Sequence, residues 1–148
     1  MDIQQLKDQI KEVKEMQAEL RELKERQVHI LVKKKNELME VIELFISEGM
    51  YFRNPQFDFY TGIGPVLGIE DSTNRVYIYN PKTNGLVLMG QGDTLEYSDE
   101  TTWLNLIDEE QFDNAIAGLD YLLDIQGKNL EIFDKEITRI KKQIDQYN

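Results

Sequence analysis

The sequence lacks cysteine altogether, which excludes disulfide bonds and metal sites with thiolate ligands. The only histidine is His29, and one histidine without a second ligand does not predict a metal site or a general base. No apolar run approaches the roughly 18 residues of a membrane span, and the first residues form no signal-peptide pattern. We therefore expect a cytoplasmic protein that does not associate with membranes.

Basic residues are scarce in the middle of the chain. The 148 residues include 28 acidic and 17 basic side chains, which gives a formal charge of −11. Residues 51–127 hold 13 of the acidic residues and only 3 of the basic ones, so the net charge of this segment is −10. Direct binding to DNA or RNA requires clustered Lys and Arg, and the sequence therefore disfavours it.

Apolar residues recur towards the C-terminus with alternating spacings of three and four residues, the heptad pattern of a coiled coil. A helix over 108–147 would be about 60 Å long at 1.5 Å per residue, and a helix of that length needs a partner. Gln126 is a polar residue within the pattern. The apolar positions are Phe112, Ile116, Leu119, Leu123, Leu130, Phe133, Ile137, Ile140, Ile144 and Tyr147.

A second heptad-like pattern runs through residues 1–48. Asp2 followed by Gln5 predicts a capping box at the start of this helix, and Gly49 is placed as a glycine that ends it. Gln27 and Lys34 are polar residues within the pattern. Its apolar positions are Ile3, Leu6, Ile10, Val13, Met16, Leu20, Leu23, Leu31, Leu38, Val41 and Phe45.

Both apolar patterns widen next to the central segment, at 38–46 and at 116–125. An antiparallel hairpin of the two helices would bring the wide parts together beneath that segment and bury more apolar surface. We therefore predict an α+β fold, with 1–148 as a single domain. Two long coiled-coil helices, at 1–48 and 108–147, would flank a small antiparallel β-meander head at 51–107.

The central segment alternates aromatic and β-branched residues with polar ones, which is typical of strands. Short turns rich in Asn, Asp, Gly and Pro separate these runs and predict antiparallel neighbours. The expected strands are 56–60, 66–70, 75–80, 86–89, 94–97 and 103–107. A capping box of Asp108 and Gln111 would then start the second helix.

The tyrosines of the expected strand 75–80 are candidate binding residues. Tyr77 and Tyr79 lie on one face with Arg75, and the opposite face is aliphatic. If the aliphatic face packs on the helices, these three side chains point outward and have the composition of a binding surface. Equally, the tyrosines could pair across the sheet or lie in a subunit interface.

Three cations are candidate anchors for an anionic ligand. Arg53, Arg75 and Lys82 are the only basic residues of 51–127, so they would have to neutralise the ligand while Tyr77 or Tyr79 stacks on it. Carboxylates gather at 93–100 and 108–113, but neither group has calcium-loop spacing or a nucleophile beside it. We predict no catalytic residue, no metal and no cofactor.

The layout resembles that of prefoldin subunits. A helix of about 45 residues, a small β region and a second long helix cover the whole chain. The resemblance is one of architecture, without a shared motif. It implies a coiled-coil hairpin with both termini at its end, and a chaperone that holds unfolded clients at the tips of a hexamer.

We predict a non-enzymatic binding protein whose helices build a homo-oligomer and whose acidic head, 51–107, binds a protein partner or a small anionic ligand. The composition also fits a phage-type accessory or inhibitory protein that occupies its target. The alternatives are a prefoldin-like holdase, a structural coiled-coil scaffold, and an acidic mimic whose carboxylates imitate nucleic-acid phosphates. The helices could pair within one chain or between chains.

Overall fold

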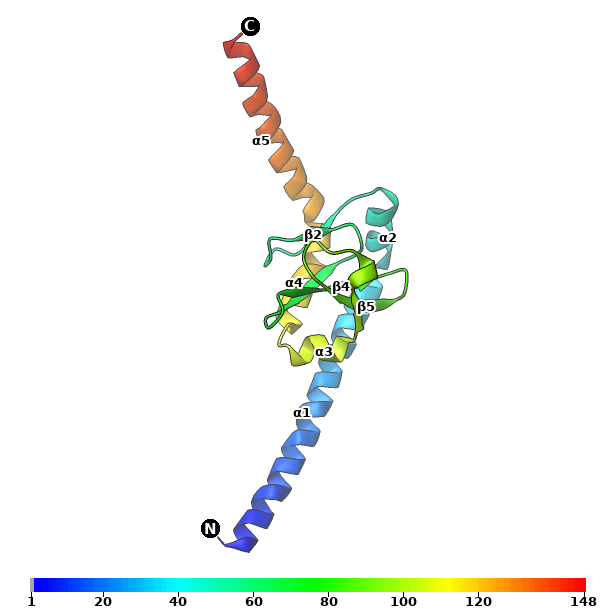
Figure 1. The fold of residues 1–148 in the computed structure, drawn as a ribbon, viewed down its shortest axis with the longest axis vertical. Coiled ribbons are helices and arrows are strands. Elements are labelled where there is room, and N and C mark those ends of the chain that lie inside the picture. Colours follow the sequence, from blue (N-terminus) through cyan, green and yellow to red (C-terminus); the bar gives the residue numbers. More distant parts are fainter. Residues whose placement is uncertain (1) are drawn as a thin grey trace.

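The computed structural model describes residues 2–148 and shows an α+β fold, as predicted, with a central body between two long helices (Figure 1). Helix α1 spans Ile3–Glu37, and α2, Met39–Ser47, follows it after a break. The predicted capping box is present: the Asp2 carboxylate accepts the N–H of Gln5 at 2.8 Å, and the Gln5 side chain accepts the N–H of Asp2 at 3.1 Å.

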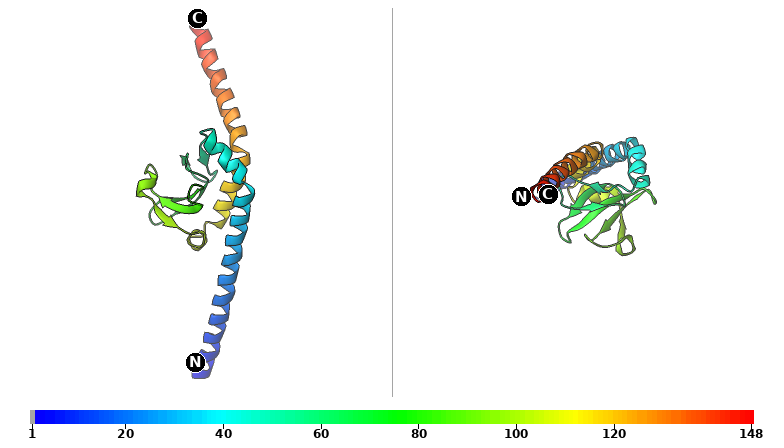
Figure 2. Two further views of the ribbon diagram at one scale, coloured as in Figure 1. Left: turned by 90° about the vertical axis from the view of Figure 1, so that its right-hand side faces the viewer. Right: turned by 90° about the horizontal axis from the view of Figure 1, so that it is seen from above.

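The break at Leu38 divides the helix that was predicted over residues 1–48. The Leu38 N–H donates to the carbonyls of Lys34 and Lys35 and ends α1. Helix α2 then leaves the line of α1 on the side of the β head (Figure 2). The wide apolar stripe predicted here supplies core residues, among them Ile42 and Phe45. Helix α2 is followed by Gly49, which has the left-handed φ of +68° expected of a terminating glycine.

The C-terminal part forms four helical segments instead of one long helix. These are α3 (Trp103–Asp108), α4 (Phe112–Asp120), the 3₁₀ turn η2 (Tyr121–Leu123) and α5 (Ile125–Gln146).

Residues 103–107, predicted as a strand, are helical because the Thr102 side chain caps α3 by accepting the Asn105 N–H at 3.1 Å. The capping box predicted for Asp108 and Gln111 is wrong, because Asp108 is the last residue of α3. Glu110 follows in a left-handed turn, with a φ of +60°.

The head is an antiparallel meander, as predicted, with a small two-stranded sheet beside it. The four-stranded sheet follows the chain in the order β3-β4-β5-β6, and β1 pairs with β2. Residues 56–59 form a loop and not a strand, and residues 95–97 form a 3₁₀ turn, η1. The strands are β1 (Phe52–Arg53), β2 (Tyr60–Thr61), β3 (Val66–Glu70), β4 (Arg75–Asn80), β5 (Gly85–Met89) and β6 (Asp99–Thr101).

The main core lies between the sheet and the helices. Tyr77 and Tyr79 of β4 belong to it, together with buried residues of α1, α2, α3, α4 and α5. The aliphatic side chains of β4, Val76 and Ile78, pack on the other face of the sheet, against Phe59 and partner residues of β5. The expectation that the aliphatic face packs on the helices is therefore wrong, and the two faces of β4 are reversed.

The predicted antiparallel hairpin of the two long helices is not formed, and the termini lie at opposite ends of the molecule (Figure 1). Two ion pairs show the direction in which α3 and α4 run relative to α1. Lys24 binds Asp108 at 2.8 Å, and ten residues further along α1 Lys34 binds Asp120 at 2.5 Å. Both positions advance together, so the segment of α3 and α4 runs parallel to α1. Helix α5 continues in this direction and leaves the body at the end opposite to the N-terminus.

Candidate interaction surface

The first part of α1 is a free arm with an apolar stripe. Every residue from 2 to 23 is exposed, and only the end of this part, at Leu20 and Leu23, lies beside other helices of the chain. We call residues 3–23 the N-terminal arm. Its stripe side chains are between 46% and 72% exposed: Ile3, Leu6, Ile10, Val13, Met16, Leu20 and Leu23.

The end of α5 is a second free arm of the same kind. Every residue from 130 to 148 is exposed, and we call residues 130–147 the C-terminal arm. Large exposed apolar patches are typical of interaction sites on proteins. The stripe side chains are between 41% and 90% exposed: Leu130, Phe133, Ile137, Ile140, Ile144 and Tyr147. The apolar spacing predicted both stripes.

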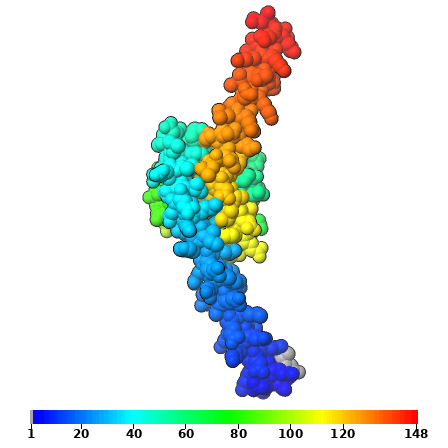
Figure 3. All heavy atoms as spheres, turned by 180° about the vertical axis from the view of Figure 1, so that it is seen from behind, coloured from blue at the N-terminus to red at the C-terminus, as the bar shows by residue number. Residues whose placement is uncertain are grey.

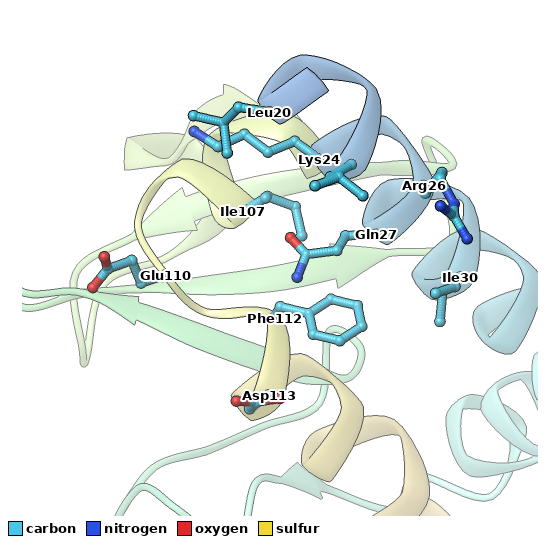
Figure 4. A pocket seen from close by; sticks show the side chains of 10 residues that line it. Leu20, Lys24, Arg26, Gln27, Ile30, Ile107, Glu110, Phe112 and Asp113 are labelled. Carbon is cyan, nitrogen blue, oxygen red and sulfur yellow. The ribbon is translucent and has the colours of Figure 1, made fainter. Parts of the chain in front are cut away.

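A groove of about 660 Å³ extends the stripe of the N-terminal arm into the body. It lies between α1 and the segment that joins α3 to α4 (Figure 4). Leu20 and Leu23 belong to both the stripe and the groove, so the two surfaces are continuous. Figure 4 shows Gln27 and Phe112 in the middle of the groove, beside Ile107.

A smaller hollow of about 460 Å³ lies where α5 leaves the body, and it contains Arg53. The half-buried guanidinium of Arg53 donates to Asn129 Oδ1 at 2.8 Å and lies 6.0 Å from the ring of Tyr121. Tyr51 and Tyr60 line the hollow with their rings edge to face, 5.1 Å apart. Arg53 forms no ion pair with any carboxylate of residues 2–148, so its charge is available to an anionic group.

The other two predicted cations lie elsewhere. Arg75, at the start of β4, binds Asp99 at 2.7 Å and Glu70 at 3.2 Å. Its hydrogen bond to Asp99 raises the pKa of the guanidinium, and Arg75 is thus engaged within the sheet. Lys82 is exposed in the turn beyond the other end of β4. The structure does not bring Arg53, Arg75 and Lys82 together into one site.

The two predicted ligand-stacking tyrosines are core residues. Tyr77 and Tyr79 are each 1% exposed. Burial raises the pKa of Tyr77 to about 12, and burial also raises the pKa of Tyr79. The Tyr79 hydroxyl donates to Asn84 Oδ1 at 2.8 Å, which satisfies its polar end. Neither ring faces a cavity into which a ligand could enter, since both pack under the helices.

Lys35 is a buried cation, although it belongs to a run of three lysines, 33–35, whose composition is typical of a solvated helix face. Its ammonium donates to Asn36 Oδ1 at 2.6 Å and to Asn84 Oδ1 at 3.2 Å, and it lies 5.0 Å from the centre of the Tyr79 ring. Burial lowers the pKa of Lys35. Its spacing of four residues from the buried Leu31 is the one signal that places it on the inner face of α1.

Carboxylates and the single histidine do not converge. Within residues 2–148, no group of three or more acidic or histidine side chains could hold a metal ion. Over the same residues, no helix combines the length and hydropathy that a membrane crossing requires.

Comparison with family models, with curated proteins and with solved structures finds no match to this chain.

Proposed function

We propose that this chain is a non-enzymatic, self-associating binding protein. The two arms hold copies of the chain together, and the acidic β head is displayed to a protein target. The observation that carries the proposal is the pair of heptad stripes, which the fold leaves uncovered along residues 3–23 and 130–147. Most of the stability of a protein helix comes from the packing of its apolar face, so each arm needs a partner surface to keep its full helical content.

The charges of the arms favour a protein partner over a membrane surface. Residues 3–23 contain five acidic and four basic side chains, and residues 130–147 contain four of each. Helices that lie on anionic membranes carry mainly Lys and Arg on the polar face. A stripe of Leu, Ile and Val between mixed charges is instead the pattern by which helices pair with one another.

The β head is suited to display and not to self-association through its sheet. The exposed edge strand β6 carries Asp99 and Glu100, and charges on an edge strand discourage the addition of another strand. The head and the helices around it, residues 51–127, carry a net charge of −10, which favours a target with a basic surface. A nucleic-acid mimic is the extreme form of this proposal, and its binding would fall steeply as salt is raised.

The resemblance to prefoldin has lost its structural basis. It rested on a hairpin with both termini at one end, whereas α4 and α5 run parallel to α1 and the termini lie at opposite ends (Figure 1). A small anionic ligand is also less favoured than a protein, because the three cations proposed to bind it are separated. Arg53 alone retains a hollow that such a ligand could enter.

Dilution tests the proposal. If copies are held together by the arms, dilution should lower the helical circular dichroism signal together with the molar mass, because separated arms lose their helical structure. The body should keep its near-ultraviolet signal from the buried tyrosines. A mass of 17.4 kDa with a helical signal that does not change over a hundredfold dilution would contradict the proposal.

A further inference from the structure

We propose that a second copy of this chain binds antiparallel to the first, so that the N-terminal arm of each copy lies along the C-terminal arm of the other. This inference rests on the proposed self-association and specifies its geometry. The pair is related by a two-fold axis that passes through the body, at right angles to the long axis of the molecule. Such an interface covers all four stripes at once and leaves none to bind further copies.

The two stripes match in length and in spacing. Ile3 to Leu20 covers 17 residue steps, and Leu130 to Tyr147 also covers 17, which is about 25 Å at 1.5 Å per residue. From Ile3 onward the steps of the N-terminal stripe are three, four, three, four and three, if Gln17 is counted. From Tyr147 backward the C-terminal stripe has the same steps. Antiparallel pairing therefore places all six layers in register.

The register gives each layer a defined composition. Ile3 meets Tyr147 of the second copy at one end, and Leu20 meets Leu130 of the second copy at the other. The only polar residue in the six layers is Gln17, which lies opposite Phe133 of the second copy. Met16, 66% exposed, is adjacent to this layer and supplies apolar surface there. The opposed helix directions also bring the dipoles of the two arms into a favourable arrangement.

The shape of the molecule favours this arrangement over a parallel one. The rod made by the two arms bends at the body, and from above both termini project on the same side (Figure 2). If the two-fold axis lies along the direction of the bend, the second copy runs in the opposite direction but bends the same way as the first. The two rods can then stay in contact along their length. A two-fold axis parallel to the rod reverses the bend of the second copy, and the arms would then separate.

The body offers a continuous surface for the centre of this interface. The face opposite the β head is built from helices, with α1 and the segment from α4 to α5 side by side (Figure 3). The groove lined by Leu23, Ile30 and Phe112 continues the stripe of the N-terminal arm towards this centre. Copies that meet through their helices leave both acidic heads on the outside, where a target can reach them.

Cysteine cross-linking tests the arrangement directly, because the chain has no cysteine of its own. Two single variants, Ile10→Cys and Ile140→Cys, place thiols in the same layer of the antiparallel pair. Within one chain, Ile10 lies on α1 and Ile140 on α5, which extend to opposite ends of the molecule (Figure 1). We expect that each variant alone stays uncross-linked under mild oxidation. After mixing and exchange of copies, the two together should form a covalent dimer. Lys142→Cys, mixed with Ile10→Cys, is the control, because Lys142 is exposed and lies two residues from Ile140 but off the stripe. This mixture should not cross-link.

The possible outcomes distinguish the antiparallel arrangement from the self-association on which it rests. Cross-linking of either single variant with itself would show parallel arms and overturn the inference. A two-chain mass without cross-links in any mixture would also overturn it, while leaving the proposed self-association in place. A one-chain mass for the unmodified protein would remove both. Cross-links confined to the mixture of Ile10→Cys and Ile140→Cys would establish the antiparallel pair.

Discussion

Two isoleucines of α5 provide a matched test of the apolar stripe. Ile137 and Ile132 are both 52% exposed and lie in the same exposed arm, but only Ile137 belongs to the heptad stripe. Replacing either one by Gln removes the same atoms and has the same effect on helix propensity. In a single chain the two substitutions are therefore equivalent. A difference in association between the two variants would therefore show that another surface covers Ile137 and not Ile132.

The expected size of the difference follows from burial. Complete burial of an Ile side chain contributes about 1.5–3 kcal/mol, and Ile137 is already half covered by its own chain, so association contributes about 1 kcal/mol in each copy. Two copies contribute about 2 kcal/mol to a dimer, which corresponds to a roughly 30-fold change in Kd. The buried amide of the new Gln adds to this cost, so about 30-fold is the minimum expected for Ile137→Gln.

Sedimentation equilibrium of both variants and the unmodified chain measures this effect. We expect Ile137→Gln to weaken association by about 30-fold or more and Ile132→Gln to leave it within about twofold. Circular dichroism at high concentration should show the same secondary structure in both variants. Equal weakening by the two substitutions, or none by either, would refute the assignment of this stripe as the association surface.

Three further predictions concern the body. Asn54→Ala should lower the free energy of unfolding in urea by roughly 2–6 kcal/mol, or about 1–3 kcal/mol for each carbonyl that loses its partner. The buried amide donates at 2.8 Å to one carbonyl of β3 and to one of α4. An unchanged urea midpoint would contradict this. Gly118→Ala should destabilise by about 1–3 kcal/mol or more, since its Cβ would lie 2.3 Å from the Val66 carbonyl, whereas Gly127→Ala, with open space around it, should be neutral or stabilising. The pKa of Tyr77 is raised from 10.0 to about 12, so its contribution to the free energy of unfolding is fully present below pH 10 and is lost as the pH rises towards 12. Tyr77→Phe should remove up to about 3 kcal/mol of this loss of stability in urea titrations at alkaline pH, and an unaltered pH profile would contradict the assignment.

Local signals in the sequence predicted several of the elements. The capping box of Asp2 and Gln5, the glycine at position 49 and the heptad spacing all act over a few residues, and the structure shows each of them. The order of strands β3 to β5 was also readable, because short turns permit only antiparallel neighbours. Strand β6, Asp99–Thr101, lies outside the strands that the sequence predicted. The segment 103–107 was misassigned because a five-residue segment with four apolar residues fits a strand or a helix. The cap at Thr102 decides for the helix.

The relative directions of the helices, and the face of β4 that packs on them, could not be predicted from the sequence in the same way. Alternation divides β4 into two faces, but it does not say which one meets the helices. The larger face, with Tyr77 and Tyr79, fills the space beneath them. The wide apolar stripes marked the parts of the helices that enter the core, yet they are equally compatible with parallel and antiparallel packing. The long-range ion pair between Lys34 and Asp120 belongs to the parallel arrangement, and spacing within one segment carries no sign of it.

The most direct test of the central claim is the molar mass of the unmodified chain in solution, measured by light scattering across a range of concentrations. One chain has a mass of 17.4 kDa. Self-association through the arms predicts a mass of twice that value, falling towards that of one chain on dilution. A mass of one chain at every concentration, with both arms fully helical, would contradict it.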